Sequence, residues 1–106
     1  MKTWIDTDTS LEWLYDLDLI VTQAEAQTCP EEGNRRMATV SEVSALLNYN
    51  FEPPVKEGCP LGYENTWTST SFKGDTYVFW NVTCFTGSVQ PKDTANRRDV
   101  VYVREV

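Results

Sequence analysis

Histidine is absent from this sequence of 106 residues. Its absence excludes Ser–His and Cys–His nucleophile pairs, and it excludes zinc and iron sites with histidine ligands. The three cysteines include no C-x-x-C pair, which argues against a zinc ribbon or a thioredoxin-like motif. No apolar run approaches the roughly 18 residues needed to cross a bilayer, so we expect no membrane insertion.

Basic residues are scarce in the first third of the chain. Residues 1–32 contain eight acids and one base, whereas residues 33–106 contain eight of each, so the whole net charge of −7 lies in the first third. A pI near 4.4 argues against nucleic-acid binding by phosphate neutralisation and against docking on anionic membranes. The acidity is typical of a solvated flank or of an electrostatic contact surface.

The odd number of cysteines leaves at least one free thiol or one intermolecular bond. Cys29 and Cys59 each precede a proline in a polar stretch, so they are the favoured pair if a disulfide forms. Such a bridge would close a loop of about 30 residues and stabilise the fold by about 3–4 kcal/mol in the chain-entropy model. The alternative is that all three cysteines, Cys84 included, are buried and reduced in a cytosolic protein.

The hydrophobic pattern predicts one α+β domain over residues 1–106. Short apolar or β-branched runs, separated by polar turns, favour strands at both ends of the chain and throughout its second half. The predicted strands are Thr3–Asp6, Leu11–Tyr15, Thr66–Thr70, Thr76–Thr83, Ser88–Pro91 and Asp99–Val106. Polar segments with proline and glycine predict loops over 29–36, 49–65 and 92–98.

Two capping boxes predict the starts of two short helices. Thr22 with Glu25 favours a helix to about residue 28, and Thr39 with Glu42 favours a helix over about Val40–Asn48. In the second helix, residues 40, 43, 46 and 47 are apolar and share one face. The loop 49–65 that follows is long for a compact domain, and such loops are usually functional or pinned.

Five motifs follow one another in a recognisable order. They are Asp8-Thr9-Ser10-Leu11-Glu12-Trp13, Arg36-Met37-Ala38-Thr39-x-x-Glu42-Val43, Thr66-Trp67-Thr68-Ser69-Thr70, Tyr77-Val78-Phe79-Trp80-Asn81-Val82 and Tyr102-Val103-Arg104. In this order they resemble the Lcl C-terminal-type domain family of bacteria over nearly the whole chain. The resemblance implies a C-type-lectin-like fold with two short helices, paired N- and C-terminal strands, a long loop region and a small antiparallel second sheet.

The resemblance also implies a location and a kind of activity. Members of this family are mostly extracytoplasmic, and adhesins are among them. We therefore expect a secreted or cell-surface protein. Because no signal peptide follows Met1, this expectation applies if a signal was removed. A native Met1 would instead favour a cytoplasmic or phage-encoded protein.

The motif residues are expected to be structural. The tryptophans are expected in the core, Thr39 and Glu42 in the cap, and the two arginines in ion pairs; the set is Trp13, Arg36, Thr39, Glu42, Trp67, Trp80 and Arg104. Side chains in or beside the long loop are better candidates for an exposed ligand-binding surface. These candidates are Tyr49, Phe51, Tyr63, Phe72, Lys73 and Asp75, on a loop face formed by residues 49–65, 71–75 and 92–98.

No metal or cofactor site is predicted. The acidic run from Asp6 resembles the start of an EF-hand loop, but leucines occupy the positions that need glycine and glutamate, Leu11 and Leu17. A different calcium site from the acids at 6, 8, 16 and 18 is less favoured than a solvated acidic face.

The leading functional hypothesis is a non-catalytic recognition domain that binds a protein or glycan through the loop face. A second hypothesis is a small acidic phage or mobile-element protein that inhibits a basic partner by masking it. A third is an accessory subunit without a ligand of its own. An enzyme is the least favoured class, because nothing in the spacing of the many carboxylates selects an acid–base pair.

Overall fold

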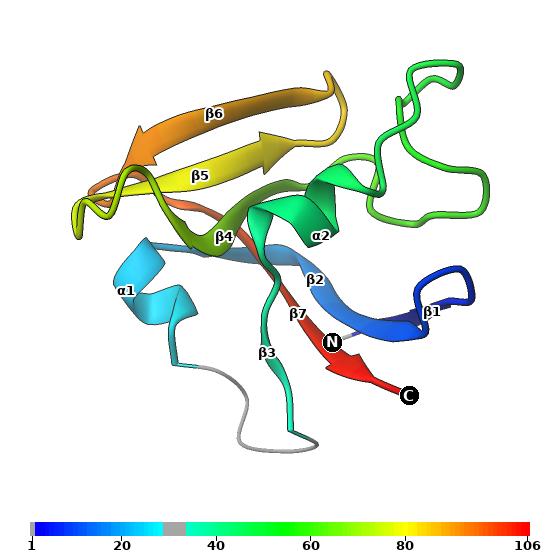
Figure 1. Cartoon of the computed structure of the whole chain (residues 1–106), viewed down its shortest axis with the longest axis horizontal. Helices are drawn as coiled ribbons and strands as arrows, with labels where there is room; N and C mark the ends of the chain where they lie inside the picture. The colour runs from blue at the N-terminus through cyan, green and yellow to red at the C-terminus, as the bar shows by residue number, and fades with distance from the viewer. Residues whose placement is uncertain (1, 29–33) are drawn as a thin grey trace.

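The structure is a computed structural model that describes residues 2–28 and 34–106, with the side chains of all of these except residues 17 and 18. The described residues form a small mixed domain of strands with two short helices (Figure 1). The elements are β1 (Lys2–Asp6), β2 (Leu11–Val21), α1 (Gln23–Ala26), β3 (Arg36–Met37), α2 (Val40–Ser44), β4 (Asn65–Ser71), β5 (Val78–Thr83), β6 (Ser88–Asp93) and β7 (Arg98–Glu105). None of the helices in these two ranges is long and apolar enough to cross a membrane.

The described strands belong to one sheet with the order β1-β2-β7-β4-β5-β6, and β3 pairs with the free part of β7. Neighbouring strands are antiparallel except β4 and β7, which are parallel. Two residue pairs, Thr66 with Asp99 and Trp67 with Val100, make that parallel join. The expected second sheet is therefore not separate: β4, β5 and β6 continue the sheet that contains the terminal strands.

The two terminal strands do not pair directly, which corrects the expectation. β2 lies between them, with Trp4 opposite Trp13 on one side and Leu14 opposite Tyr102 on the other. β2 also extends to Val21 instead of ending at Tyr15, because its distal part pairs with the start of β7 after a register shift. The strands β1 and β7 are thus linked through β2, which pairs with both.

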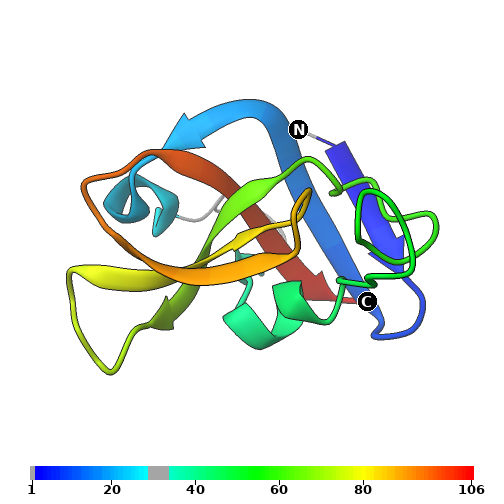
Figure 2. The same cartoon turned by 90° about the horizontal axis from the view of Figure 1, so that it is seen from above.

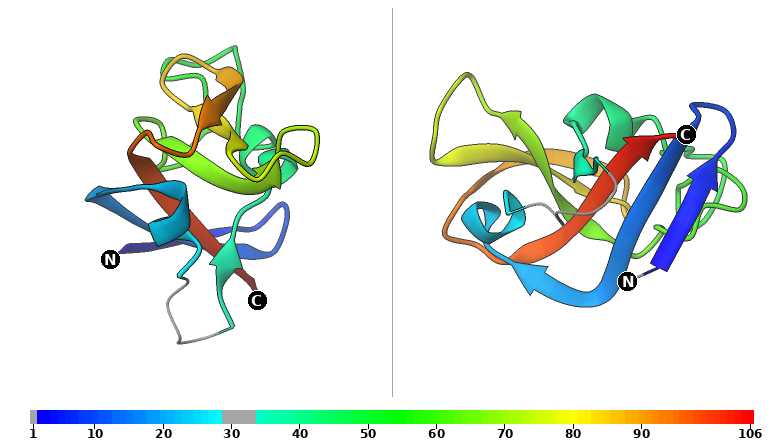
Figure 3. Two further views of the ribbon diagram at one scale, coloured as in Figure 1. Left: turned by 90° about the vertical axis from the view of Figure 1, so that its left-hand side faces the viewer. Right: turned by 90° about the horizontal axis from the view of Figure 1, so that it is seen from below.

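Alternate residues of β7 pack into two cores on opposite faces of the sheet, as the period of a strand requires. Val101 and Val103 join the cluster that contains Val43 of α2, while Val100 and Tyr102 join the cluster on the α1 side. Figure 3 shows the two helices on opposite sides of β7. Of the motif tryptophans, the first is buried in the α2-side core and Trp67 in the α1-side core, whereas the third, at position 80, is half-buried.

Both helices begin where the capping boxes predicted. Thr22 and Thr39 each accept a hydrogen bond from the backbone of a glutamate three residues on, and each glutamate returns to the cap backbone. α2 ends at Ser44, earlier than the predicted Asn48. The Asn48 backbone N–H donates to the Pro54 carbonyl of the long loop at 2.9 Å, so it does not make the bond to the Ser44 carbonyl that a helix reaching Asn48 would need.

The long loop is pinned to the rest of the domain at several points. Val55 and Leu61 are buried in the α2-side core. The Lys56 ammonium lies 3.0 Å from the Asp6 carboxylate and 3.1 Å from that of Asp8, in the turn between β1 and β2. Figure 2 shows the loop folded beside β1 at one end of the molecule. Despite its length, the loop is therefore held against the rest of the domain.

Candidate functional site

The predicted ligand-binding residues do not form one surface. The long loop, which contains Tyr49, Phe51 and Tyr63, extends over one end of the molecule. The turn between β4 and β5 lies at the other end (Figures 1 and 2). That turn carries Phe72 and the two polar candidates beside it. The expected single loop face is thus divided in two.

Tyr49 is highly exposed but already has a partner within the chain. Its hydroxyl donates a hydrogen bond of 2.8 Å to the carbonyl of Gly87 in the turn between β5 and β6. Gly87 has φ +76°, and an added Cβ there would overlap the Tyr49 ring. Tyr49 therefore clamps the long loop to this turn. The Phe51 side chain, in contrast, is exposed.

The turn between β4 and β5 is held by its own contacts. The Phe72 ring meets Trp80 edge to face at 5.3 Å between centroids, and the Lys73 ammonium lies 5.3 Å from the centre of the same ring. Asp75 accepts the backbone N–H of Tyr77 at 2.8 Å, an Asx-type turn bond. These three predicted ligand residues shape the turn through their own contacts.

Tyr63, also a predicted ligand residue, borders a hollow. The hollow has a volume of about 240 Å³ and is lined by Ile20, Tyr63, Asn65, Phe85, Arg97, Arg98 and Asp99. Tyr63 is 75% exposed, and the apolar residues at positions 20 and 85 are about half exposed. Three large apolar side chains from the end of β2, the long loop and the β5–β6 turn thus meet at one surface, which is typical of a binding site.

The polar groups of this hollow are fixed from several sides. Arg97 forms an exposed ion pair of 3.3 Å with Glu25 of α1. Arg98 donates a hydrogen bond of 2.7 Å to the carbonyl of Arg97, and its buried Nε has no partner in the part of the chain described. Asp99 accepts the Asn65 backbone N–H at 2.7 Å. The hollow therefore offers both donors and acceptors beside its apolar rim.

A buried carboxyl group lies next to the hollow. Glu64 is 1% exposed, and its carboxyl interacts with that of Asp99. Burial, and then the negative charge of Asp99, raise the pKa of Glu64 to about 8. Burial also raises the pKa of Asp99, although the Asn65 N–H bond acts in the opposite direction.

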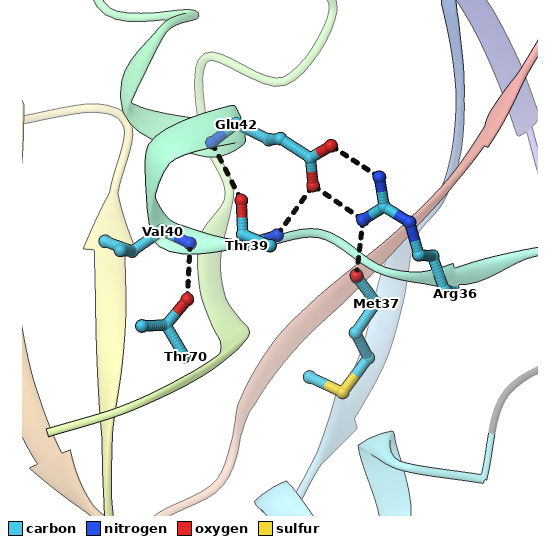
Figure 4. Close-up of polar contacts among 6 residues, drawn as sticks. All are labelled: Arg36, Met37, Thr39, Val40, Glu42 and Thr70. Atoms are coloured by element: carbon cyan, nitrogen blue, oxygen red, sulfur yellow. Dashed lines mark hydrogen bonds and ion pairs between the residues drawn. The ribbon is translucent and has the colours of Figure 1, made fainter. Parts of the chain in front are cut away.

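Arg36, Thr39 and Glu42 form one structural network at the start of α2 (Figure 4). The Glu42 carboxylate receives both terminal nitrogens of Arg36, at 2.7 and 2.6 Å, and the Thr39 N–H at 2.8 Å. The hydrogen bond from Arg36 is the main reason that the pKa of Glu42 lies below its usual value. Val40 N–H then donates to the Thr70 hydroxyl, which ties the helix start to β4.

Arg104 also acts within the fold. Its Nε lies 2.6 Å from Glu12 Oε1, and Arg35 approaches the same oxygen at 2.8 Å. The Arg104 bond is the main cause of a lowered pKa at Glu12. A second hollow of about 440 Å³ is lined by Asn34, Arg36, Arg104, Glu105 and Val106. Both of its arginines are paired with glutamates, and its lining contains no aromatic side chain, unlike that of the hollow beside Tyr63.

Two acids of the first third hold a lysine, and two of the cysteines lie among the described residues. Asp6 and Asp8 hold the Lys56 ammonium, and in residues 2–28 and 34–106 no group of three or more metal-ligating side chains is placed to hold a metal. Cys59 and Cys84 are free thiols, and burial raises the pKa of Cys84 to about 12. The Cys29 half of the predicted disulfide lies outside the described residues.

Sequence reasoning did not single out most of the hollow. Asn65, Arg97 and Arg98 fell in the segments 49–65 and 92–98 of the expected loop face, but Ile20, Phe85 and Asp99 were not proposed. The available signal was a large apolar residue beside a polar turn, as Phe85 stands before Thr86-Gly87. Comparison of the chain with protein-family models, with curated proteins and with solved structures gives no match.

Proposed function

We propose that this chain is a non-catalytic recognition domain that binds a protein or glycan ligand at the hollow rimmed by Ile20, Tyr63 and Phe85. The observation that carries the proposal is the convergence of these exposed apolar side chains from three separate segments on one hollow. Aromatic rings supply contact area at low entropic cost, and the flanking arginines and Asp99 supply directional hydrogen bonds. Such a combination suits a sugar ring or a side chain of a partner protein.

We also infer that the domain has a C-type-lectin-like fold of the Lcl C-terminal type. The supporting features are two capped helices early in the chain, a long pinned loop after the second helix, and a final strand at the centre of the sheet. The ordered motifs fall on β2 with the turn before it, on β3 with α2, and on β4, β5 and β7. In keeping with that family, we propose a bacterial secreted or surface location.

The inhibitor hypothesis has less support than recognition at the hollow. It needs a free carboxylate cluster to mask a basic partner, yet acids of the first third are engaged within the chain. Asp6 binds Lys56, Glu12 binds two arginines, and Glu25 binds Arg97. These pairs reduce the field that could steer a basic protein.

The test uses a glycan array and a pull-down from the surroundings of the source organism, each run with three proteins. They are the wild type, Tyr63→Ala with Phe85→Ala, and the control Tyr77→Ala. Tyr77 is 72% exposed, which matches Tyr63, but it lies outside the hollow. We expect a ligand that the wild type and the control bind and that the double variant loses at least tenfold. Equal binding by all three proteins would contradict the proposal.

A further inference from the structure

Two carboxyl groups meet where the two halves of the sheet are joined. Glu64 immediately precedes β4, and Asp99 is the second residue of β7. Thr66 pairs with Asp99 across the parallel join, so the sheet itself brings the acids together. Neither carboxyl oxygen of Glu64 receives a hydrogen bond from an N–H or hydroxyl donor in the described part of the chain. The Asp99 carboxyl is the group with which it interacts.

The charged groups around Glu64 do not neutralise it. The charges that act on its carboxyl are those of Asp99 on β7 and Asp16 on β2, and both are negative. Arg98 acts on Asp99, and the buried Cys84 thiol faces the same acids from the end of β5. An ionised Glu64 would thus be a buried charge without a cationic partner, which is costly. A protonated Glu64 can instead donate its O–H to the Asp99 carboxylate.

The protonation of this pair matters to the hollow because the hollow spans the same join. Tyr63 and Asn65 line it from the β4 side, whereas Arg98 and Asp99 line it from the β7 side. The join has only two residue pairs. A second negative charge placed there would push the two sides apart.

We propose that Glu64 and Asp99 share a single proton that holds the two sides of the hollow together, so that stability falls as the pH rises toward the point where the folded protein loses this proton, and ligand binding weakens when it is lost. The binding part rests on the proposed function, whereas the stability part needs no ligand. The sign follows from linkage. A folded-state pKa of about 8 at Glu64 lies above its ordinary 4.5, so the folded state binds the extra proton between these values. Stability therefore falls as pH rises through this window.

The first experiment measures unfolding in urea between pH 5 and pH 9 for the wild type, Glu64→Gln and the exposed control Glu57→Gln. Glutamine keeps the shape, donates to Asp99 and never ionises. As the pH rises toward 8, the folding equilibrium constants of the wild type and of the control are expected to fall relative to that of Glu64→Gln. The expected fall is up to about tenfold for each pH unit. Parallel pH profiles for all three proteins would overturn the shared proton.

A second measurement does not depend on the variant folding. Carbon-13 NMR of the wild type follows the carboxyl signal of Glu64 during a pH titration. We expect a midpoint well above pH 6, and a midpoint near the ordinary 4.5 would refute the proposal.

The binding part is tested with the ligand that the array or pull-down identifies. Its affinity for the wild type is expected to decrease at least fivefold from pH 7 to pH 9, with a smaller decrease for Glu64→Gln. An equal decrease for both proteins would refute the coupling to binding. If the hollow binds nothing, the proposed function fails, while the urea and NMR results still decide whether the proton is shared.

Discussion

The contact of Tyr49 with Gly87 allows a quantitative test of how the long loop is held. Replacing Gly87 by alanine has two separable consequences. The residue has φ +76°, where an L-residue with a Cβ is strained by about 1–2 kcal/mol. The added Cβ also overlaps the Tyr49 ring, which is exposed enough to swing away but would then lose its 2.8 Å hydrogen bond to the Gly87 carbonyl.

The lost hydrogen bond is worth about 1 kcal/mol. Gly87→Ala should therefore destabilise the wild type by about 2–3 kcal/mol, the sum of strain and displacement. In a Tyr49→Ala background the ring is already gone, so the same substitution should cost only the strain of about 1–2 kcal/mol. The difference, a coupling of about 1 kcal/mol, is the stabilisation that the clamp provides.

The assay is a double-mutant cycle with four proteins, each unfolded in urea and followed by tryptophan fluorescence. The slope of the transition should be unchanged, so that midpoints report stability alone. If Gly87→Ala costs the same with and without Tyr49, the two residues do not act together and the clamp does not exist. Binding of a ligand at the hollow should be unaffected by Tyr49→Ala, because Tyr49 does not line it.

Three further predictions concern the core and the caps. Thr39→Ala removes the side-chain half of a capping box and should cost about 1 kcal/mol in urea unfolding; a change below 0.3 kcal/mol would contradict the cap. Trp67→Phe leaves the Val21 carbonyl without its 3.0 Å indole donor and opens a cavity, so we expect a loss of about 2–4 kcal/mol by the same assay, and a neutral effect would refute this packing. The Cys84 thiol is fully buried with a pKa near 12, so peptide-resolved alkylation at pH 8 should label it only in denaturant; rapid native labelling would disprove its burial.

Features set by neighbouring residues could be predicted from the sequence. Each capping box needs only a threonine and a glutamate three residues later, so both helix starts were confirmed. The end of α2 could not be predicted, because it depends on the Pro54 carbonyl of the loop, which takes the Asn48 backbone N–H. The distal half of β2 likewise exists only because β7 returns beside it.

The candidate site shows the same division between local and distant information. The aromatic character of Tyr63 in a loop of polar residues was sufficient to select it. Its neighbours in the hollow come from the ends of β2, β5 and β7, which are brought together only by the strand order of the sheet. The parallel join between β4 and β7 leaves no pattern in the sequence, since two residue pairs carry it.

The position of β7 in the sheet also governs when the domain can fold during synthesis. The ribosome adds residues from the N-terminus, so Arg98–Glu105 is made after every other strand of the described chain. Until then β2 and β4 lack their common neighbour, and the nascent hairpins on either side have apolar edges open to other chains. The sheet can therefore be completed only after residue 105 has been synthesised.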